Sequence, residues 1–353
     1  AISKMRPHWV EFTNALKQFT PAFGVLPDGC EAYFTFGNVQ LPRYVPELLK
    51  DALMHKPFQT LSFVNKAGVW ANGAGMSVDS ILDIANSNKH LQKLRIGNNF
   101  IGMDDIAKIC SVVRYGSIVE LNLRNCFENG LGHDMITSLL TSGGLAKLKR
   151  LGLESARITS SSITLLANFL ATNPMLKELN LSSNDLSGDC VDLLANALRS
   201  NTSLRILQLF DNFISNAGYE SFRLVLHGDS NLNSIADSNH SCVLEGVEFS
   251  WNVDRVRKNE TWHEATESFN RARKIYKLLS ARNKSMSTSN VQHFDDVDIK
   301  LLPSIFEAVQ RYAIAIYPND QFSSDYCRVE PLSIVYEVMR KWDKVFPVYD
   351  TEK

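Results

Sequence analysis

One spacing of leucines recurs along the first two thirds of the chain. Its two clearest copies are Leu176-Lys-Glu-Leu179-Asn-Leu181-Ser-Ser-Asn184-Asp-Leu186 and Leu204-Arg-Ile-Leu207-Gln-Leu209-Phe-Asp-Asn212-Phe-Ile214. Both read LxxLxLxxNxL. Weaker copies begin at Glu31, Phe58, Leu91, Ile118, Leu148 and Leu232, so a new copy starts about every 28 residues. A regular period of this length is typical of a protein built from stacked repeats.

Each copy predicts a short strand followed by a helix. In the LxL part, leucines alternate with polar residues, so the leucines point to one side of a strand and into the core. The asparagine that follows can bond buried backbone groups where the chain leaves the strand. The rest of a repeat, as in residues 190–198, carries the apolar stripe of an amphipathic helix. Since one unit cannot bury its own apolar side, we expect an α/β horseshoe with a parallel sheet on the concave face and helices on the convex face.

Helical patterns flank the repeats at both ends. Four apolar residues recur at helical spacing behind Pro7, a favourable first-turn residue, and predict a helix that caps the first repeat. They are Trp9, Phe12, Leu16 and Phe19. After the last copy, residues 244–249 could form a further strand, residues 271–277 a basic helix, residues 285–289 a linker and residues 302–346 two more helices. We therefore divide the chain into a helical cap at 1–30, about eight repeats at 31–250 and a C-terminal helical cap or appendage at 251–353.

The motifs resemble the ribonuclease-inhibitor type of leucine-rich repeat over about residues 31–242. The asparagine position departs from that pattern in the weaker copies, which hold Val39, Lys66, Cys126, Ala156 and His240 there. The chain also resembles leucine-rich-repeat proteins of diatoms and related photosynthetic protists, in which SNH-C and a basic helix ending in LLSxRN follow the last repeat. These motifs are Ser238-Asn-His-Ser-Cys242 and 278–283 here. That group has no well-established activity, so the resemblance implies an architecture more than a function.

Composition narrows the choice of partners. The 37 Lys and Arg nearly cancel the 38 Asp and Glu, so the chain projects no strong field toward nucleic acid or an anionic membrane. No apolar run is long enough for membrane insertion, which predicts a soluble protein. The six cysteines form no CxxC pair and favour a reducing, intracellular compartment, either the cytoplasm or an organelle. The first residue, Ala1, leaves open the earlier removal of a targeting peptide.

Candidate chemistry is sparse. His240 and Cys242 lack the further ligands that zinc needs, so we interpret His240 as a turn residue in the motif asparagine position. Gly73 and Gly75 lack the remainder of a phosphate-binding loop. The basic stretch 255–284 is interrupted by glutamates and is interpreted as a solvated helix face. Asp104 and Asp105 fall at a helix start, where they favour the helix dipole. We therefore expect no enzyme activity, no cofactor, no metal, no nucleic acid and no small-molecule substrate.

The polar residues between the inward leucines are the candidate binding site. They are expected to be exposed on the concave face, as is Ser182, and they combine charges with one aromatic residue, as protein interfaces do. The predicted partner-binding residues are Arg95, Glu120, Arg124, Arg150, Glu154, Glu178, Phe210 and Asp211. Lys93, Asn122, Asn180 and Gln208 lie on the same predicted face.

The sequence therefore predicts a non-enzymatic scaffold that binds a protein partner of unknown identity on its concave face. Two alternatives stay open. One is a structural subunit of a large assembly. The other is a regulatory adaptor or a GTPase activator, because Ran GTPase activators and F-box adaptors carry similar repeats. The first two repeats offer only Tyr33, Thr35, Thr60 and Ser62 on this face, and residues 1–29 are short for an F-box.

Overall fold

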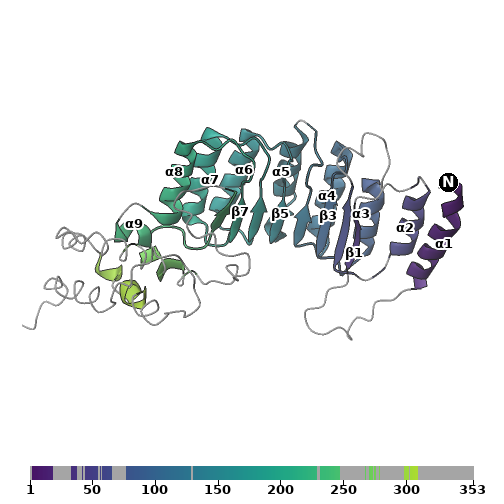
Figure 1. The fold of residues 1–353 in the computed structure, drawn as a ribbon, viewed down its shortest axis with the longest axis horizontal. Coiled ribbons are helices and arrows are strands. Elements are labelled where there is room, and N and C mark those ends of the chain that lie inside the picture. The colour runs from purple at the N-terminus through teal and green to yellow at the C-terminus, as the bar shows by residue number, and fades with distance from the viewer. Residues whose placement is uncertain are drawn as a thin grey trace, which may run out of the picture. The chain divides into compact units, whose positions relative to one another are not determined.

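Eight parallel strands form one sheet in chain order in the computed structural model of the protein (Figure 1). The structure describes residues 2–18, 33–37, 42, 44–54, 56, 58–65, 77–128, 130–228, 231–246, 267, 270–272, 274–275, 278, 298–301 and 303–308. The strands are β1 (Tyr33–Gly37), β2 (Thr60–Val64), β3 (Lys93–Gly97), β4 (Glu120–Asn122), β5 (Arg150–Gly152), β6 (Glu178–Asn180), β7 (Ile206–Gln208) and β8 (Val243–Glu245).

Helices alternate with these strands, and α2 to α7 lie along one side of the sheet in Figure 1. The α-helices are α1 (Ile2–Gln18), α2 (Val45–Leu53), α3 (Val78–Ser87), α4 (Met103–Tyr115), α5 (Leu131–Thr141), α6 (Ser160–Ala171), α7 (Gly188–Ser200), α8 (Asn216–His227) and α9 (Leu232–Ala236). Two short 3-10 helices are η2 (Leu145–Lys147) and η5 (Ile299–Leu301). The face of the sheet turned away from α2 to α7, predicted to be concave, is called the open face below.

The inward leucines of the motif form the core. Leu121, Leu151, Leu179 and Leu207 pair in register on β4 to β7, and each side chain is almost fully buried. Burial of a leucine side chain stabilises a fold by roughly 1.5–3 kcal/mol. The same register position holds Phe34 on β1 and a leucine on each of β2 to β8. A large apolar residue at this position in every strand therefore fixes the register of the sheet, and the predicted α/β repeat architecture is confirmed.

The motif asparagines pair the backbone of neighbouring repeats, as predicted. Asn184 Oδ1 accepts from the backbone N–H groups of Ala156 and Ile158 at 2.9 and 3.1 Å, and its Nδ2 donates to Leu153 O at 2.7 Å. Asn212 repeats the pattern one unit later. At the same position Cys126 donates its thiol to Ile96 O, and burial raises its pKa to about 12, which keeps the thiol protonated.

Helix α1 caps the first repeat. Trp9 and Leu16 pack against Val45 and Leu49 of α2, whereas the Phe12 side chain is about half exposed; Phe19 lies outside the described residues. The expectation that the helix begins at Pro7 is wrong, because α1 already begins at Ile2. Pro7 lacks the N–H that would donate to a backbone carbonyl in the first turn of α1. Near the start of a helix, water can donate to that carbonyl instead.

The prediction of a repeat beginning at Leu232 is also wrong. Residues 232–236 form helix α9, whose start is capped by the Asn231 side chain accepting from Ser234 N. The eighth strand is Val243–Glu245, which overlaps at residues 244 and 245 the segment 244–249 that the sequence suggested as a further strand. The asparagine cap at this point favours a helix turn over the strand that the 28-residue period implies.

The chain divides into two compact units. The first comprises residues 1–219 and 243–253 and holds α1 to α7 with the eight strands. The second comprises residues 220–242 and 254–353 and holds α9, η5 and described helical residues at 270–278 and 303–308. The division into cap, repeats and appendage stays a prediction. Val39, Lys66, Gly73, Gly75, the linker at 285–289 and the helix expected at 332–346 lie outside the described residues.

Candidate functional site

The open face carries three rows of side chains, one from each outward position of the strands. The first row, in Cα register, is Lys93, Glu120, Arg150, Glu178 and Ile206. The second is Arg95, Asn122, Gly152, Asn180 and Gln208. The third, two residues further along each repeat, is Gly97, Arg124, Glu154, Ser182 and Phe210. Seven of the eight predicted binding residues lie in these rows, and Asp211 follows Phe210 at an exposed turn with a positive φ of 52°.

Four of the predicted residues form a continuous chain of ion pairs across β3 to β6. Arg95 Nε donates to Glu120 Oε1 at 2.8 Å, Arg150 Nη1 lies 3.4 Å from Glu120 Oε2, and Arg150 Nε lies 2.8 Å from Glu178 Oε1. The hydrogen bond to Glu178 is the main cause of the raised pKa of Arg150. Because two cations alternate with two anions, this chain is neutral overall and holds its four side chains in fixed positions.

Glu120 departs from the prediction that the whole set is exposed. Its side chain is only 9% accessible, whereas those of Arg95 and Arg150 are 46% and 48% accessible. The two arginines cover the carboxylate and supply the hydrogen bonds that a buried carboxylate needs. Glu120 therefore positions the two arginines, and a partner on this face would meet the guanidinium groups.

A second ion pair lies in the third row. Arg124 Nη2 is 3.1 Å from Glu154 Oε1, and the arginine side chain is 56% accessible. Gln208 Nε2 donates to Glu245 Oε2 at 2.8 Å on β8. Glu245 is not among the predicted site residues, because the eighth copy of the motif was expected to begin at Leu232. The signal for it is the Val-Leu-Glu segment after Cys242.

Phe210 is an exposed aromatic residue of the open face. Its side chain is 46% accessible, and Val243 on the neighbouring strand is 36% accessible. Gly246 passes against it: a Cβ at this glycine, whose φ is +82°, would lie 2.2 Å from Phe210 N. Only glycine tolerates both this φ and this approach. Gly246 therefore lies close against Phe210, whose side chain stays partly accessible.

Ser182 also departs from the prediction. It was expected on the exposed strand face, but it is 4% accessible. Its Oγ has no hydrogen-bond partner in the described part of the chain. A serine side chain is short, so longer neighbours in a row of the sheet can exclude water from it.

The N-terminal part of the open face is uncharged in the described residues of β1 and β2. Thr35 is exposed, while Thr60 and Ser62 are buried; the Tyr33 side chain lies outside the description. Among the described side chains of these two strands, the exposed hydroxyl group on this face is that of Thr35.

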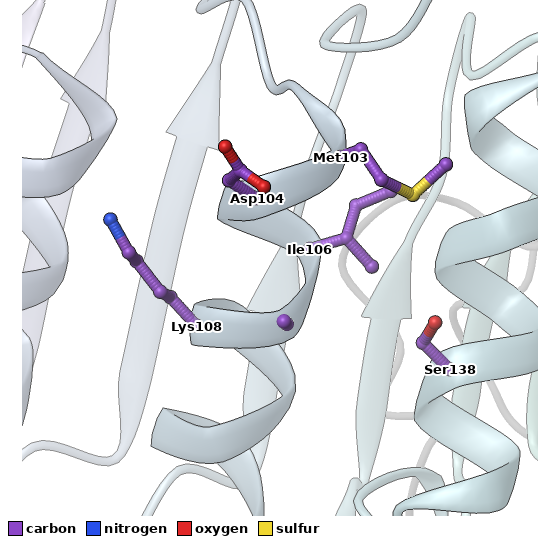
Figure 2. Close-up of a pocket in the computed structure, with 6 residues that line it drawn as sticks. Met103, Asp104, Ile106, Lys108 and Ser138 are labelled. Carbon is purple, nitrogen blue, oxygen red and sulfur yellow. The ribbon is translucent and has the colours of Figure 1, made fainter.

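A shallow depression on the helical side combines an acid, an amine and a hydroxyl group without bringing them together. It lies between α4 and α5 and is lined by Met103, Asp104, Ile106, Lys108 and Ser138 (Figure 2). Figure 2 shows Lys108 extending away from Ser138, and its amine forms an ion pair with an aspartate of α3. Asp105, beside this depression, lies in the first turn of α4, as expected from the sequence, and accepts from Gly102 N at 2.9 Å. This arrangement offers no positioned nucleophile and base.

The second unit contains a buried polar cluster. His240 is buried, and its pKa is lowered to about 3 by that burial and by the cations of Lys274 and Arg271. Lys274 Nζ donates to Asn239 O at 2.6 Å, and Asn270 Nδ2 donates to His240 O at 2.7 Å. His240 is therefore a neutral core residue, and the interpretation that it replaces the motif asparagine is wrong because α9 displaces the eighth strand. Among the described residues, no three His, Cys, Asp or Glu side chains are grouped to hold a metal ion.

No helix within the described ranges is long and apolar enough to span a bilayer. No curated protein matches the chain. A family model described as Leucine Rich repeat matches residues 172–195 and 200–222, which contain the two clearest copies of the motif. Leucine-rich repeats generally mediate binding between proteins and are typically not catalytic. The matched repeats and the eight-stranded parallel sheet with alternating helices support a leucine-rich-repeat fold for this chain.

Proposed function

We propose that the protein is a non-enzymatic scaffold that binds another protein on the open face of its sheet. The observation that carries this proposal is the ordered arrangement of exposed groups across β3 to β8: three guanidinium groups held by carboxylates, and one aromatic ring beside Gly246. Arginine and aromatic side chains are enriched in the residues that dominate binding energy at protein interfaces.

The arginines and Phe210 have different parts in this proposal. Arg95, Arg124 and Arg150 are already paired, so a partner carboxylate must share them with Glu120, Glu154 and Glu178. Such charges set orientation and association rate more than affinity. Among the described residues, no charged group contacts the Phe210 ring, and burying its exposed ring supplies affinity.

The test begins with partners captured from an extract and identified by mass spectrometry, each then prepared in pure form. Phe210→Ala should weaken binding of the partner at least tenfold, and Arg124→Glu should slow association. The matched controls are Phe213→Ala, which removes a 72% accessible phenylalanine from the following turn, and Arg199→Glu at the end of α7. Loss of binding in the controls with retention in both open-face variants would overturn the proposal.

A further inference from the structure

Three cations lie side by side at the edge of the sheet where the strands begin. Lys149, Lys177 and Arg205 immediately precede β5, β6 and β7, and we call them the basic edge column. Lys177 N donates to Lys149 O at 2.7 Å, and Arg205 N donates to Lys177 O at 2.8 Å. Adjacent strands lie about 4.8 Å apart, so the three side chains leave the same edge within about 10 Å.

The basic edge column lacks compensating charge. Within the described part of the chain, none of its three side chains forms an ion pair with a carboxylate, and the adjacent Glu178 is bound to Arg150. The pKa of Lys177 is lowered by partial burial and by the charges of Arg205 and Lys149. Arg205 Nη1 is buried, and no described residue is its hydrogen-bond partner. Like charges placed side by side on neighbouring strands destabilise a sheet, so this arrangement costs stability without an internal benefit.

Capping of helix ends does not account for the column. Lys147, at the same edge, does cap a helix: its Nζ donates to Arg114 O and Gly116 O at 2.7 and 2.8 Å, as a cation near a helix C-terminus is expected to do. The side chains of the three column residues form no such bond to the end of any described helix. The equivalent positions of earlier repeats are neutral and make the same backbone bonds; they are Gln59, Gln92 and Val119. The position therefore does not require a cation.

We propose that the basic edge column binds an acidic segment of a protein, a contact that goes beyond the open face. An extended peptide advances about 3.3 Å per residue, so two or three carboxylates of one acidic segment can meet three cations spread over about 10 Å. Nucleic acid fits less well, because it binds through long positive surfaces. Here the net charge of the chain is −1 and Glu178 adjoins the column.

The probe is a fluorescein-labelled decapeptide of alternating glutamate and serine, and fluorescence anisotropy measures its binding to the full chain at 50 mM salt. Replacing Lys149 and Lys177 together by glutamine should raise the Kd at least fivefold. Lys177→Arg should retain the affinity, because it keeps the charge. The control variant replaces Lys108 and Arg199 by glutamine, which changes the net charge equally away from the column, and it should stay within twofold of the parent chain. Circular dichroism establishes that each variant is folded.

Three results would overturn the proposal: no binding of the peptide by the parent chain, an equal loss in the column and control variants, or tighter binding of a single-stranded 20-nucleotide DNA through the same lysines. Phe210→Ala should leave the affinity for the peptide unchanged. A chain that binds the peptide normally but shows no role for Phe210 in partner binding would contradict the proposed function alone, so the two proposals fail separately.

Discussion

At the scale of single residues, the alternation of side chains along the strands predicts most of the residues on the open face. It does not predict how deeply each side chain is buried or how its charge is paired. The sequence identifies Arg95, Glu120, Arg150 and Glu178 as neighbours on one face. It does not reveal that Glu120 is covered by two arginines, because the directions of long side chains depend on which charges lie opposite in the register. Alternation predicts a face, and the register decides the accessibility of each side chain on it.

The burial of Glu120 leads to a prediction about stability. Glu120→Gln removes a carboxylate shared by two arginines and should lower the free energy of unfolding by about 1–2 kcal/mol, a figure reduced from that of fully buried pairs because both arginines are half exposed. Glu178→Gln, at a more accessible position with one arginine, should cost less than about 1 kcal/mol. Urea denaturation monitored by circular dichroism measures both. Equal losses would contradict the positioning role of Glu120.

At the scale of the strand, the neighbouring residues Leu181 and Ser182 point to opposite sides of the sheet: Leu181 to the core and Ser182 to the open face. Leu181 is fully buried, so Leu181→Ala should destabilise by about 2–5 kcal/mol. Ser182→Ala should change stability by less than about 0.5 kcal/mol or raise it slightly, because the buried Oγ lacks a partner and its removal leaves no group unpaired. The thermal midpoints of the two variants measure the difference. A loss at Ser182 as large as that at Leu181 would refute this assignment of strand faces.

At residues 232–236 the 28-residue period predicts a new repeat, but the chain forms a helix. The motif spacing is strong where leucines occupy every inward position, and weak at Leu232, where Asn231 caps a helix. The period also could not show which residues surround His240, because Asn270 and Lys274 reach it from 30 or more residues away. A local capping signal therefore determines that residues 232–236 form a helix, whereas contacts with residues far along the chain determine the environment of His240.

The partly buried Lys274 makes the stability of the second unit depend on pH. Burial lowers its pKa to about 7 from 10.5, so between these values the unfolded chain binds a proton that the folded chain does not. The contribution of this lysine to stability is therefore greatest above pH 10.5, declines as the pH falls, and levels off below about 7.

Lys274→Met removes this titration. The difference in thermal midpoint between the parent chain and this variant, measured from pH 7 to 10, should shift in favour of the parent as the pH rises. Lys300→Met, at a described lysine with an exposed side chain, should give a constant difference. A constant difference for Lys274→Met as well would show that the amine is not buried in the folded chain.

At the scale of the whole molecule, the central claim is that the open face of the sheet is the binding surface. The repeats predict such a surface because a parallel sheet left uncovered on one face exposes a regular array of side chains. The identity of the partner depends on the particular groups in that array, among them the paired arginines and Phe210, and the repeat pattern does not determine it.

The most direct test is site-specific photo-crosslinking from the full chain. Benzoylphenylalanine replaces Phe210 in one preparation and Phe213 in another, so the same aromatic probe lies on the open face or on the following turn. Each preparation is irradiated with an identified partner, and the covalent products are resolved by mass spectrometry. The account predicts a cross-link to the partner from position 210 and little from position 213. Cross-linking from position 213 with none from position 210 would contradict it.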